Sequence, residues 1–230
     1  MTTFSDGMTI GATRGRTGGK MIRSSLAMLD FVPATLDRNG FCAAQQIGAA
    51  GNLTLNGALV VGGVGYCDVA DVEMFGRCVG LYSSGNLSAI TFTIYGYDTY
   101  GKPLVVSRAG PNNSTVATTK AFGRVTRVAA SAAVGTNVEV GTVDTFGLPM
   151  YLKSLTQVVR SGFDAVLAED AATIVVGVTT TASATTGDVR GTFTPSAAAD
   201  GTKRLTCVFI PDLTSKYTKF GVKQYGAGLV

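Results

Sequence analysis

The chain has 230 residues, of which 46% are hydrophobic and only 15% are charged, and its formal net charge is +4. This length suits one large β domain or two small ones, and the hydrophobic content is enough to bury a sizeable core. Histidine is absent, which removes the commonest general base, Ser-His-Asp and Cys-His catalysis, and most zinc and non-haem iron sites.

The low share of charged residues has two explanations. About a quarter of the residues in a soluble domain are usually charged, so either neighbouring subunits bury part of this surface or its many Thr, Ser, Asn and Gly residues wet it. The charge is also uneven, because residues 1–23 and 203–223 together carry a net +7 and the remainder carries −3. Basic ends favour docking to an acidic surface.

Residues 1–25 are predicted to form an extended basic arm. Five glycines make this backbone costly to order, and few apolar residues offset that cost. A partner would therefore order the arm, or nothing would. The expected partner-binding residues of this arm are Arg14, Arg16, Lys20 and Arg23.

The Gly-rich stretch 11–21 invites a phosphate-loop interpretation, which fails on two positions. Arg14 stands where the motif needs its first glycine, and Met21 stands where it needs Ser or Thr. Direct nucleic-acid binding is not expected either, because the basic groups are few and no aromatic residues lie between them.

Residues 26–230 are predicted to form the β domain. In its first part, 26–32 indicates a helical turn or a short strand, and Phe41–Ile47 is the best helix candidate of the chain. Residues 53–61 read as a strand interrupted at Asn56-Gly57, a dipeptide typical of hairpins. Met74–Tyr82 reads as another strand.

The acidic residues Asp68, Asp71 and Glu73 form the one acidic cluster of the sequence. Paired carboxylates could serve catalysis or bind Ca²⁺, but Ca²⁺ needs more oxygen ligands than three side chains supply. A solvated sheet edge is the preferred interpretation, so the sequence predicts no catalytic residue, no metal site and no cofactor.

Residues 86–149 are predicted to be the central β unit. Ile90, Phe92 and Ile94 alternate with polar residues and Tyr95, which indicates a half-buried strand. A turn at 98–102 follows, in which Gly101 is free to take a positive φ. Further short apolar runs lie at 104–106, 122–128 and 138–143, each bounded by turn residues, a pattern typical of a sandwich or barrel.

Three tyrosines, Tyr95, Tyr97 and Tyr100, gather near the tip of the first hairpin of this unit. Tyr95 and Tyr97 should share the face opposite Phe92 and Ile94. Exposed tyrosines suit a protein interface, because a rigid amphipathic ring gives contact area at low entropy cost. Alternatively, they cover a second sheet or loops of the same domain.

The C-terminal strands are expected within 150–222. Residues 151–159 read as one strand or two, Ser161-Gly162 as a break, and 164–172 as a connecting loop. The nearly continuous apolar run 174–178 predicts a strand covered on both faces, which 179–186 could extend. Residues 205–209 predict a buried strand. In the tail, the expected partner-binding residues are Lys216, Lys219 and Lys223.

Four cysteines occur at positions 42, 67, 78 and 207, without a C-x-x-C pair. Buried reduced thiols are expected, although a Cys67–Cys78 disulfide stays open. No apolar run is long enough to span a membrane. The first residues lack the order of a signal peptide, so we expect a protein made and kept in a cytoplasm.

Several stretches resemble virion structural proteins of tailed bacteriophages. In the central unit these are the strand from Asn86, the Asp98–Gly101 turn, Gly110-Pro-Asn, the Ala121-Phe-x-x-Val-x-x-Val strand and the ending Val138–Pro149. Residues 185–196 and 200–205 resemble the C-terminal part of the same proteins. The resemblance covers roughly 86–210 and implies a component of a virus particle, assembled in a host cytoplasm.

We therefore expect an all-β, antiparallel β-sandwich or barrel with extended termini and little helix. The expected function is that of a capsid decoration or cement protein, a homotrimer that binds the major capsid protein on the outer face of the head. A tail or head–tail connector component is the alternative. A carbohydrate-binding module or a host-surface glycosidase is a more remote one, since the chain has no Trp on which sugars could stack.

Overall fold

The computed structural model describes residues 2–3, 9–17, 20–67, 76–164, 172–178 and 187–211, with side chains from residue 26 onward. Their regular structure consists of antiparallel strands and one short 3₁₀ helix, η1 (Leu155–Gln157), capped by Ser154. The expected all-β class with little helix is confirmed. Among the described residues no helix has the length and apolar character to traverse a bilayer.

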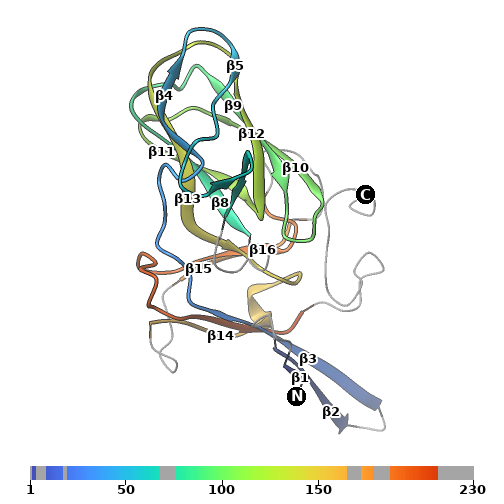
Figure 1. Ribbon diagram of the computed structural model, residues 1–230. Coiled ribbons are helices and arrows are strands. Elements are labelled where there is room, and N and C mark those ends of the chain that lie inside the picture. Colours follow the sequence, from blue (N-terminus) through green and yellow to red (C-terminus); the bar gives the residue numbers. More distant parts are fainter. Residues whose placement is uncertain are drawn as a thin grey trace.

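The strands form three sheets, called A, B and C (Figure 1). Sheet A has the order β1 (Thr2–Thr3), β2 (Thr9–Thr17), β3 (Lys20–Phe31), β17 (Leu205–Phe209) and β14 (Val158–Phe163). Sheet B has the order β11 (Asn112–Phe122), β8 (Arg77–Asn86), β13 (Val134–Gly147), β16 (Gly191–Thr194) and β15 (Thr173–Val176), with β4 (Cys42–Ile47) also on β13. Sheet C has the order β10 (Pro103–Ala109), β9 (Thr91–Tyr97), β12 (Arg124–Ala130), β7 (Val64–Tyr66) and β6 (Val60–Val61), with β5 (Gly51–Asn52) on β12.

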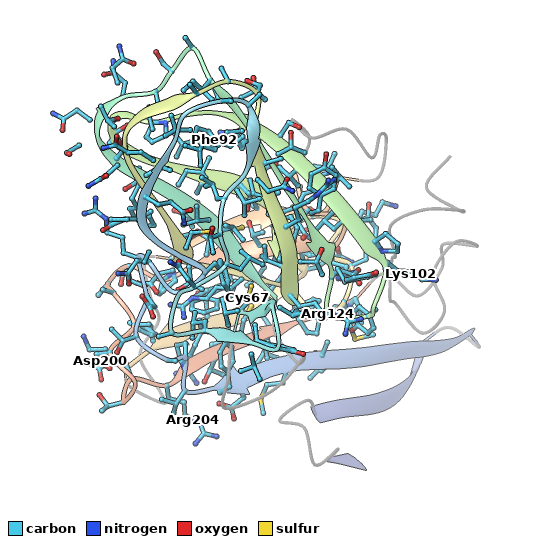
Figure 2. All side chains as sticks on the ribbon, turned by 45° about the horizontal axis from the view of Figure 1, so that its top comes forward. Cys67, Phe92, Lys102, Arg124, Asp200 and Arg204 are labelled. Atoms are coloured by element: carbon cyan, nitrogen blue, oxygen red, sulfur yellow. The ribbon has the colours of Figure 1, made fainter. Side chains whose placement is uncertain are left out.

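Sheets B and C share the first hydrophobic core and form a sandwich, which is called the upper body below because it fills the upper part of Figure 1. Sheet C contributes Phe92 and Ile94, and sheet B contributes Leu81 and Val140. Phe92 is fully buried, and Figure 2 shows it inside the upper body. Full burial of such a side chain stabilises the fold by roughly 1.5–3 kcal/mol. The alternation predicted for β9 is thus confirmed, with Phe92, Ile94 and Gly96 buried and the residues between them half-buried.

Sheet A and the lower part of sheet B share a second core. β3 and β17 contribute Leu29 and Phe209, while the end of β13 and β16 contribute Phe146 and Phe193. The 14-residue strand β13 serves both cores, because Val138 and Val140 belong to the first core and Phe146 to the second. An irregularity between Thr142 and Phe146 marks the passage from one core to the other.

The stretch expected as an extended arm contains β1, β2 and the first half of β3. β2 and β3 form an antiparallel hairpin from Thr9↔Met28 to Thr17↔Lys20. β3 pairs with β17 only from Ala27 to Phe31, and Figure 1 shows the hairpin leaving the body beyond that point. That a partner orders this segment stays a prediction.

Two predictions in the first part of the domain are wrong. The helix candidate Phe41–Ile47 is strand β4, which pairs with β13 and places Phe41 and Cys42 in the first core. Asn56-Gly57 makes no hairpin turn, because both backbone amides donate to the carbonyl of Phe41. The hairpin lies between β6 and β7, where Gly62 and Gly63 have φ of 59° and 80°.

Three predictions in the C-terminal part are wrong as well. Residues 151–159 do not form one or two strands, because they contain the 3₁₀ helix η1 and β14 begins only at Val158. Ser161-Gly162 does not break a strand but lies within β14, where both residues pair with β17. β15 is not covered on both faces, since it is the edge strand of sheet B and Val175 is 45% exposed. The buried strand at 205–209 is confirmed as β17, with Leu205, Cys207 and Phe209 buried. Most of 164–172 and all of 179–186 lie outside the described residues.

Candidate interaction face

The outer face of sheet C carries alternating tyrosines and arginines. On β9, Tyr95 and Tyr97 lie opposite the core residues Phe92 and Ile94, as predicted. The pairing of β12 with β9 sets Arg124 across from Tyr97 and Arg127 across from Tyr95. A register shift between Val125 and Arg127 allows both arginines to reach this face although they are three residues apart.

Each arginine stacks on the tyrosine across from it. The guanidinium carbon of Arg127 lies 3.6 Å from the ring centroid of Tyr95, and that of Arg124 lies 4.5 Å from the ring centroid of Tyr97. Both distances are within the range of cation–π attraction, worth about 0.5–1 kcal/mol at exposed sites. The stacking therefore fixes four large side chains before any partner arrives, which lowers the entropy cost of binding.

An exposed apolar residue extends this face on the neighbouring strand. Val105 of β10 pairs with Tyr95 and is 49% exposed. Arg127 and Thr126 are exposed on the other side of Tyr95. The group Tyr95, Tyr97, Val105, Arg124 and Arg127 is called the Tyr–Arg face below, and Figure 2 labels Arg124 on it.

Tyr100 does not belong to this face, although the sequence grouped it with Tyr95 and Tyr97. Its hydroxyl donates to the carbonyl of Pro149 at 2.5 Å, and its ring lies 4.8 Å from the guanidinium carbon of Arg190. Asp98 turns the chain here by accepting the amides of Tyr100 and Lys102. Gly101 has a φ of +73°, which confirms the predicted turn.

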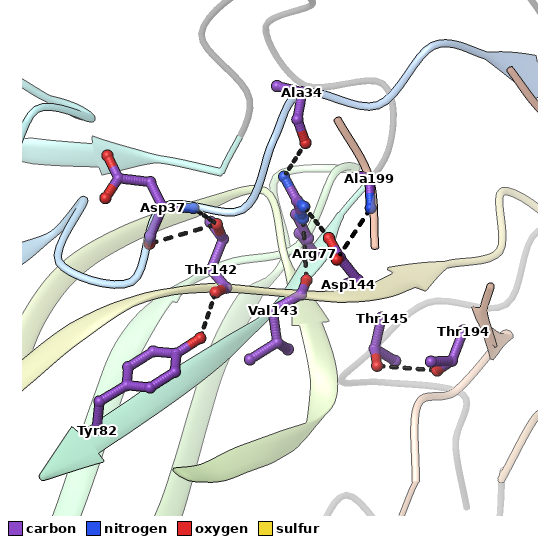
Figure 3. A network of polar contacts seen from close by, with 10 residues as sticks. All are labelled: Ala34, Asp37, Arg77, Tyr82, Thr142, Val143, Asp144, Thr145, Thr194 and Ala199. Carbon is purple, nitrogen blue, oxygen red and sulfur yellow. Dashed lines mark hydrogen bonds and ion pairs between the residues drawn. The ribbon is translucent and has the colours of Figure 1, made fainter. Parts of the chain in front are cut away.

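A buried polar network centres on Arg77 and is structural (Figure 3). The guanidinium donates to the carbonyls of Val143 and Ala34 at 2.9 and 3.0 Å and pairs with the carboxylate of Asp144. The other oxygen of Asp144 accepts the amide of Ala199. Arg77 is 2% exposed, and these contacts join the 32–40 segment, β13 and the 195–200 loop.

The described cysteines offer no reactive site. All four are buried and none forms a disulfide, which confirms the expectation of buried, reduced thiols and leaves the Cys67–Cys78 disulfide unformed. Burial raises the pKa of the Cys42 and Cys207 thiols to about 12. Within the described part of the chain, no three His, Cys, Asp or Glu residues are grouped as metal ligands would be.

The remaining sequence candidates are placed only in part. Arg14, Arg16, Lys20 and Arg23 occupy β2 and the start of β3, where Arg14 is paired with Arg23. Lys216, Lys219 and Lys223 lie outside the described residues, as do Asp68, Asp71 and Glu73.

Comparisons of the chain with protein families, with curated proteins and with solved structures find no match. The candidate site therefore rests on its own geometry. Sequence reasoning missed Arg124 and Arg127, because their partnership with Tyr97 and Tyr95 depends on strand register. Their occurrence in a strand with buried Val125 and Val128 was the available signal.

Proposed function

We propose that this protein is a structural subunit of a tailed-phage virion, of the capsid decoration or cement kind. It binds the outer face of the assembled head as a homotrimer, and its partner is the major capsid protein. The Tyr–Arg face and the basic β2–β3 hairpin make the contacts. The phage assignment rests on the resemblance of residues 86–210, and the docking role rests on the Tyr–Arg face.

The observation that carries the docking role is the composition of this face. Tyrosine and arginine are enriched at protein interfaces and dominate their binding energy. Here they are stacked in two pairs beside an exposed valine. Such a preorganised, amphipathic surface suits contact with another protein surface better than it suits enclosure of a small substrate.

The basic residues of the β2–β3 hairpin suit a partner with an acidic surface. Its register pairs Arg14 with Arg23 and Arg16 with Met21, so three arginines lie at neighbouring positions of this strand pair. Like charges at directly opposed positions destabilise a strand pair. Two-stranded hairpins are marginally stable in water, and carboxylates from a neighbour would stabilise this one.

The copy number of the protein in purified particles tests the assignment. Hundreds of copies are expected for a decoration protein, whereas six or twelve would assign it to the tail or the connector. Complete absence from particles would overturn the virion role itself.

A matched pair of variants tests the docking face. Val105 and Val61 are exposed valines on opposite edge strands of sheet C, β10 and β6. Val105→Glu should lower occupancy on stripped particles about tenfold or more, since it puts a charge beside Tyr95, while Val61→Glu should rebind like the wild type. Equal rebinding of both variants would rule out the Tyr–Arg face as the docking surface.

A further inference from the structure

A polar groove lies on the other side of the sandwich, on the outer face of sheet B. Two cavities of about 260 and 150 Å³ meet at Arg38, Ser83 and Ser84. The larger extends over the start of β11, and the smaller extends over β13 and β4 toward Asn137 and Ala44. Each is smaller than the roughly 300–1,000 Å³ of pockets for drug-sized ligands, so each would take one small ring.

Arg38 is held in place between the two cavities. Its Nε lies 2.7 Å from a carboxylate oxygen of Glu139, and its guanidinium carbon lies 4.9 Å from the ring centroid of Tyr82. The Tyr82 hydroxyl in turn donates to the carbonyl of Thr142 at 2.7 Å. The Arg38 side chain is nevertheless 54% exposed, so a preorganised guanidinium faces the groove.

Uncharged polar side chains form the walls. Ser84, Asn113 and Thr115 are exposed, and their side chains make no hydrogen bond among the described residues. Ser83 is already occupied, since its hydroxyl donates to the carbonyl of Asn137 at 2.8 Å. In the groove, Arg38 and Ser83 are thus held by bonds within the protein, whereas the hydroxyls of Ser84 and Thr115 and the amide of Asn113 can form hydrogen bonds with a ligand.

The charges of the groove favour a neutral ligand. The positive charge of Arg38 is offset by Glu139, and a phosphate or carboxylate would be repelled by that same carboxylate. A metal cation would be repelled by Arg38. Hydroxyl and amide groups offer both donors and acceptors, as a sugar hydroxyl does.

We propose that this groove binds a neutral oligosaccharide, with one sugar ring on each side of Arg38. Recognition is by hydrogen bonds to adjacent ring hydroxyls, from Arg38 and Glu139 in the centre and from Ser84, Asn113 and Thr115 at the side. This mode does not need the tryptophan that the chain lacks. The site stands on its own geometry and is independent of the proposed virion role.

The test is an NMR titration of the isotope-labelled full-length protein with cellotetraose, maltotetraose and tetra-N-acetylchitotetraose. At least one of these should shift the backbone amides of Ser84, Thr115 and Asn137 saturably, together with the Arg38 Nε–H signal. Inorganic phosphate is the anionic comparison and should leave these signals unchanged. If none of the three sugars shifts them, or if phosphate alone does, the proposal is wrong.

Variants separate the groove from the rest of the surface. Arg38→Gln should weaken binding of the responding sugar at least tenfold, whereas Arg127→Gln, an arginine of the opposite sheet that also stacks on a tyrosine, should leave it unchanged. Thr115→Val changes one exposed hydroxyl without touching the ion pair and should weaken binding several-fold. Unchanged binding in both Arg38→Gln and Thr115→Val would overturn the assignment, whatever the particle experiments give.

Discussion

The carboxylate of Asp98 accepts a 3.0 Å hydrogen bond from Nη1 of Arg190, a residue 92 positions later in the chain. Both side chains are buried, at 0% and 3% exposure. The second oxygen of Asp98 accepts the amides of Tyr100 and Lys102. This pair therefore ties the β9–β10 turn of sheet C to the segment that leads into β16 of sheet B.

Loss of one partner of this pair should destabilise the fold strongly. Asp98→Ala removes the carboxylate that pairs with the buried Arg190 guanidinium, and breaking such a buried pair costs about 3–5 kcal/mol. The free energy of unfolding from urea denaturation measures the effect. Lys203→Ala is the control, because the Lys203–Asp200 pair is exposed at 29% and 44% and should contribute about 0–1 kcal/mol. Similar small losses in both variants would mean that the buried pair is not a strong link.

Alanine should be tolerated at Gly135 of β13 but should destabilise the fold at Gly141. A Cβ at Gly141 would lie 1.9 Å from the carbonyl oxygen of Asp37, whereas a Cβ at Gly135 would meet nothing within 4 Å. Gly141→Ala must therefore push away the 32–40 segment, which we expect to cost at least about 3 kcal/mol. Gly135→Ala should change stability by less than about 1 kcal/mol. Thermal unfolding of the two variants measures the difference, and Gly141→Ala should melt at the lower temperature. Equal melting temperatures would contradict this prediction.

The buried thiols should make stability fall in alkali. Burial raises the pKa of Cys42 and Cys207 from 9.0 to about 12, so the folded state keeps protons that the unfolded state loses. Their contribution is complete below pH 9 and is lost progressively from pH 9 to about 12. The urea midpoint should therefore drop between pH 8 and pH 10.5, and it should drop less in Cys42→Ala relative to its own value at pH 8. The native protein should also resist a thiol reagent at pH 8 and expose four thiols in denaturant.

The basic hairpin should account for part of the salt dependence of docking. Replacement of Arg14, Arg16, Lys20 and Arg23 with Ser removes four charges that each contribute about 0–1 kcal/mol and are screened by salt. Occupancy on stripped particles should be lower than for the wild type and should depend less on salt. Replacement of Lys216, Lys219 and Lys223 with Ser measures the other basic end separately. Wild-type rebinding of the arm variant at every salt concentration would exclude an electrostatic role.

Periodicity predicted those elements in which one strand face is buried. In β9, Phe92 and Ile94 alternate with Thr93 and Tyr95, and the burial of the folded strand follows that alternation. The turn at Gly101 was predictable because few other residues take its positive φ. Local sequence is sufficient to predict a strand when every second side chain is buried in the core and the turn that follows is short.

Elements that depend on distant partners escaped sequence reasoning. Phe41–Ile47 has helix-forming residues, but β13 supplies backbone hydrogen bonds and the core takes Phe41, so tertiary pairing overrides propensity. Likewise, the pairing of Arg127 with Tyr95 follows from a register shift, and the Arg38 groove joins residues from five separate segments. Neither arrangement leaves a spacing that could be recognised in the linear sequence.

The pairing of β3 with β17 determines which of the two cores can fold first during translation. Every buried residue of the first core except Val189 lies between positions 41 and 140. The sandwich of sheets B and C can therefore form while the ribosome is still translating the later residues. The second core needs residues 27–31 beside 205–209, so it cannot form before residue 209 has emerged from the ribosome. A nascent chain stalled before residue 205 would contain β2 and β3 but not β17, which would expose the core residues Leu29 and Phe31 to chaperones during that interval.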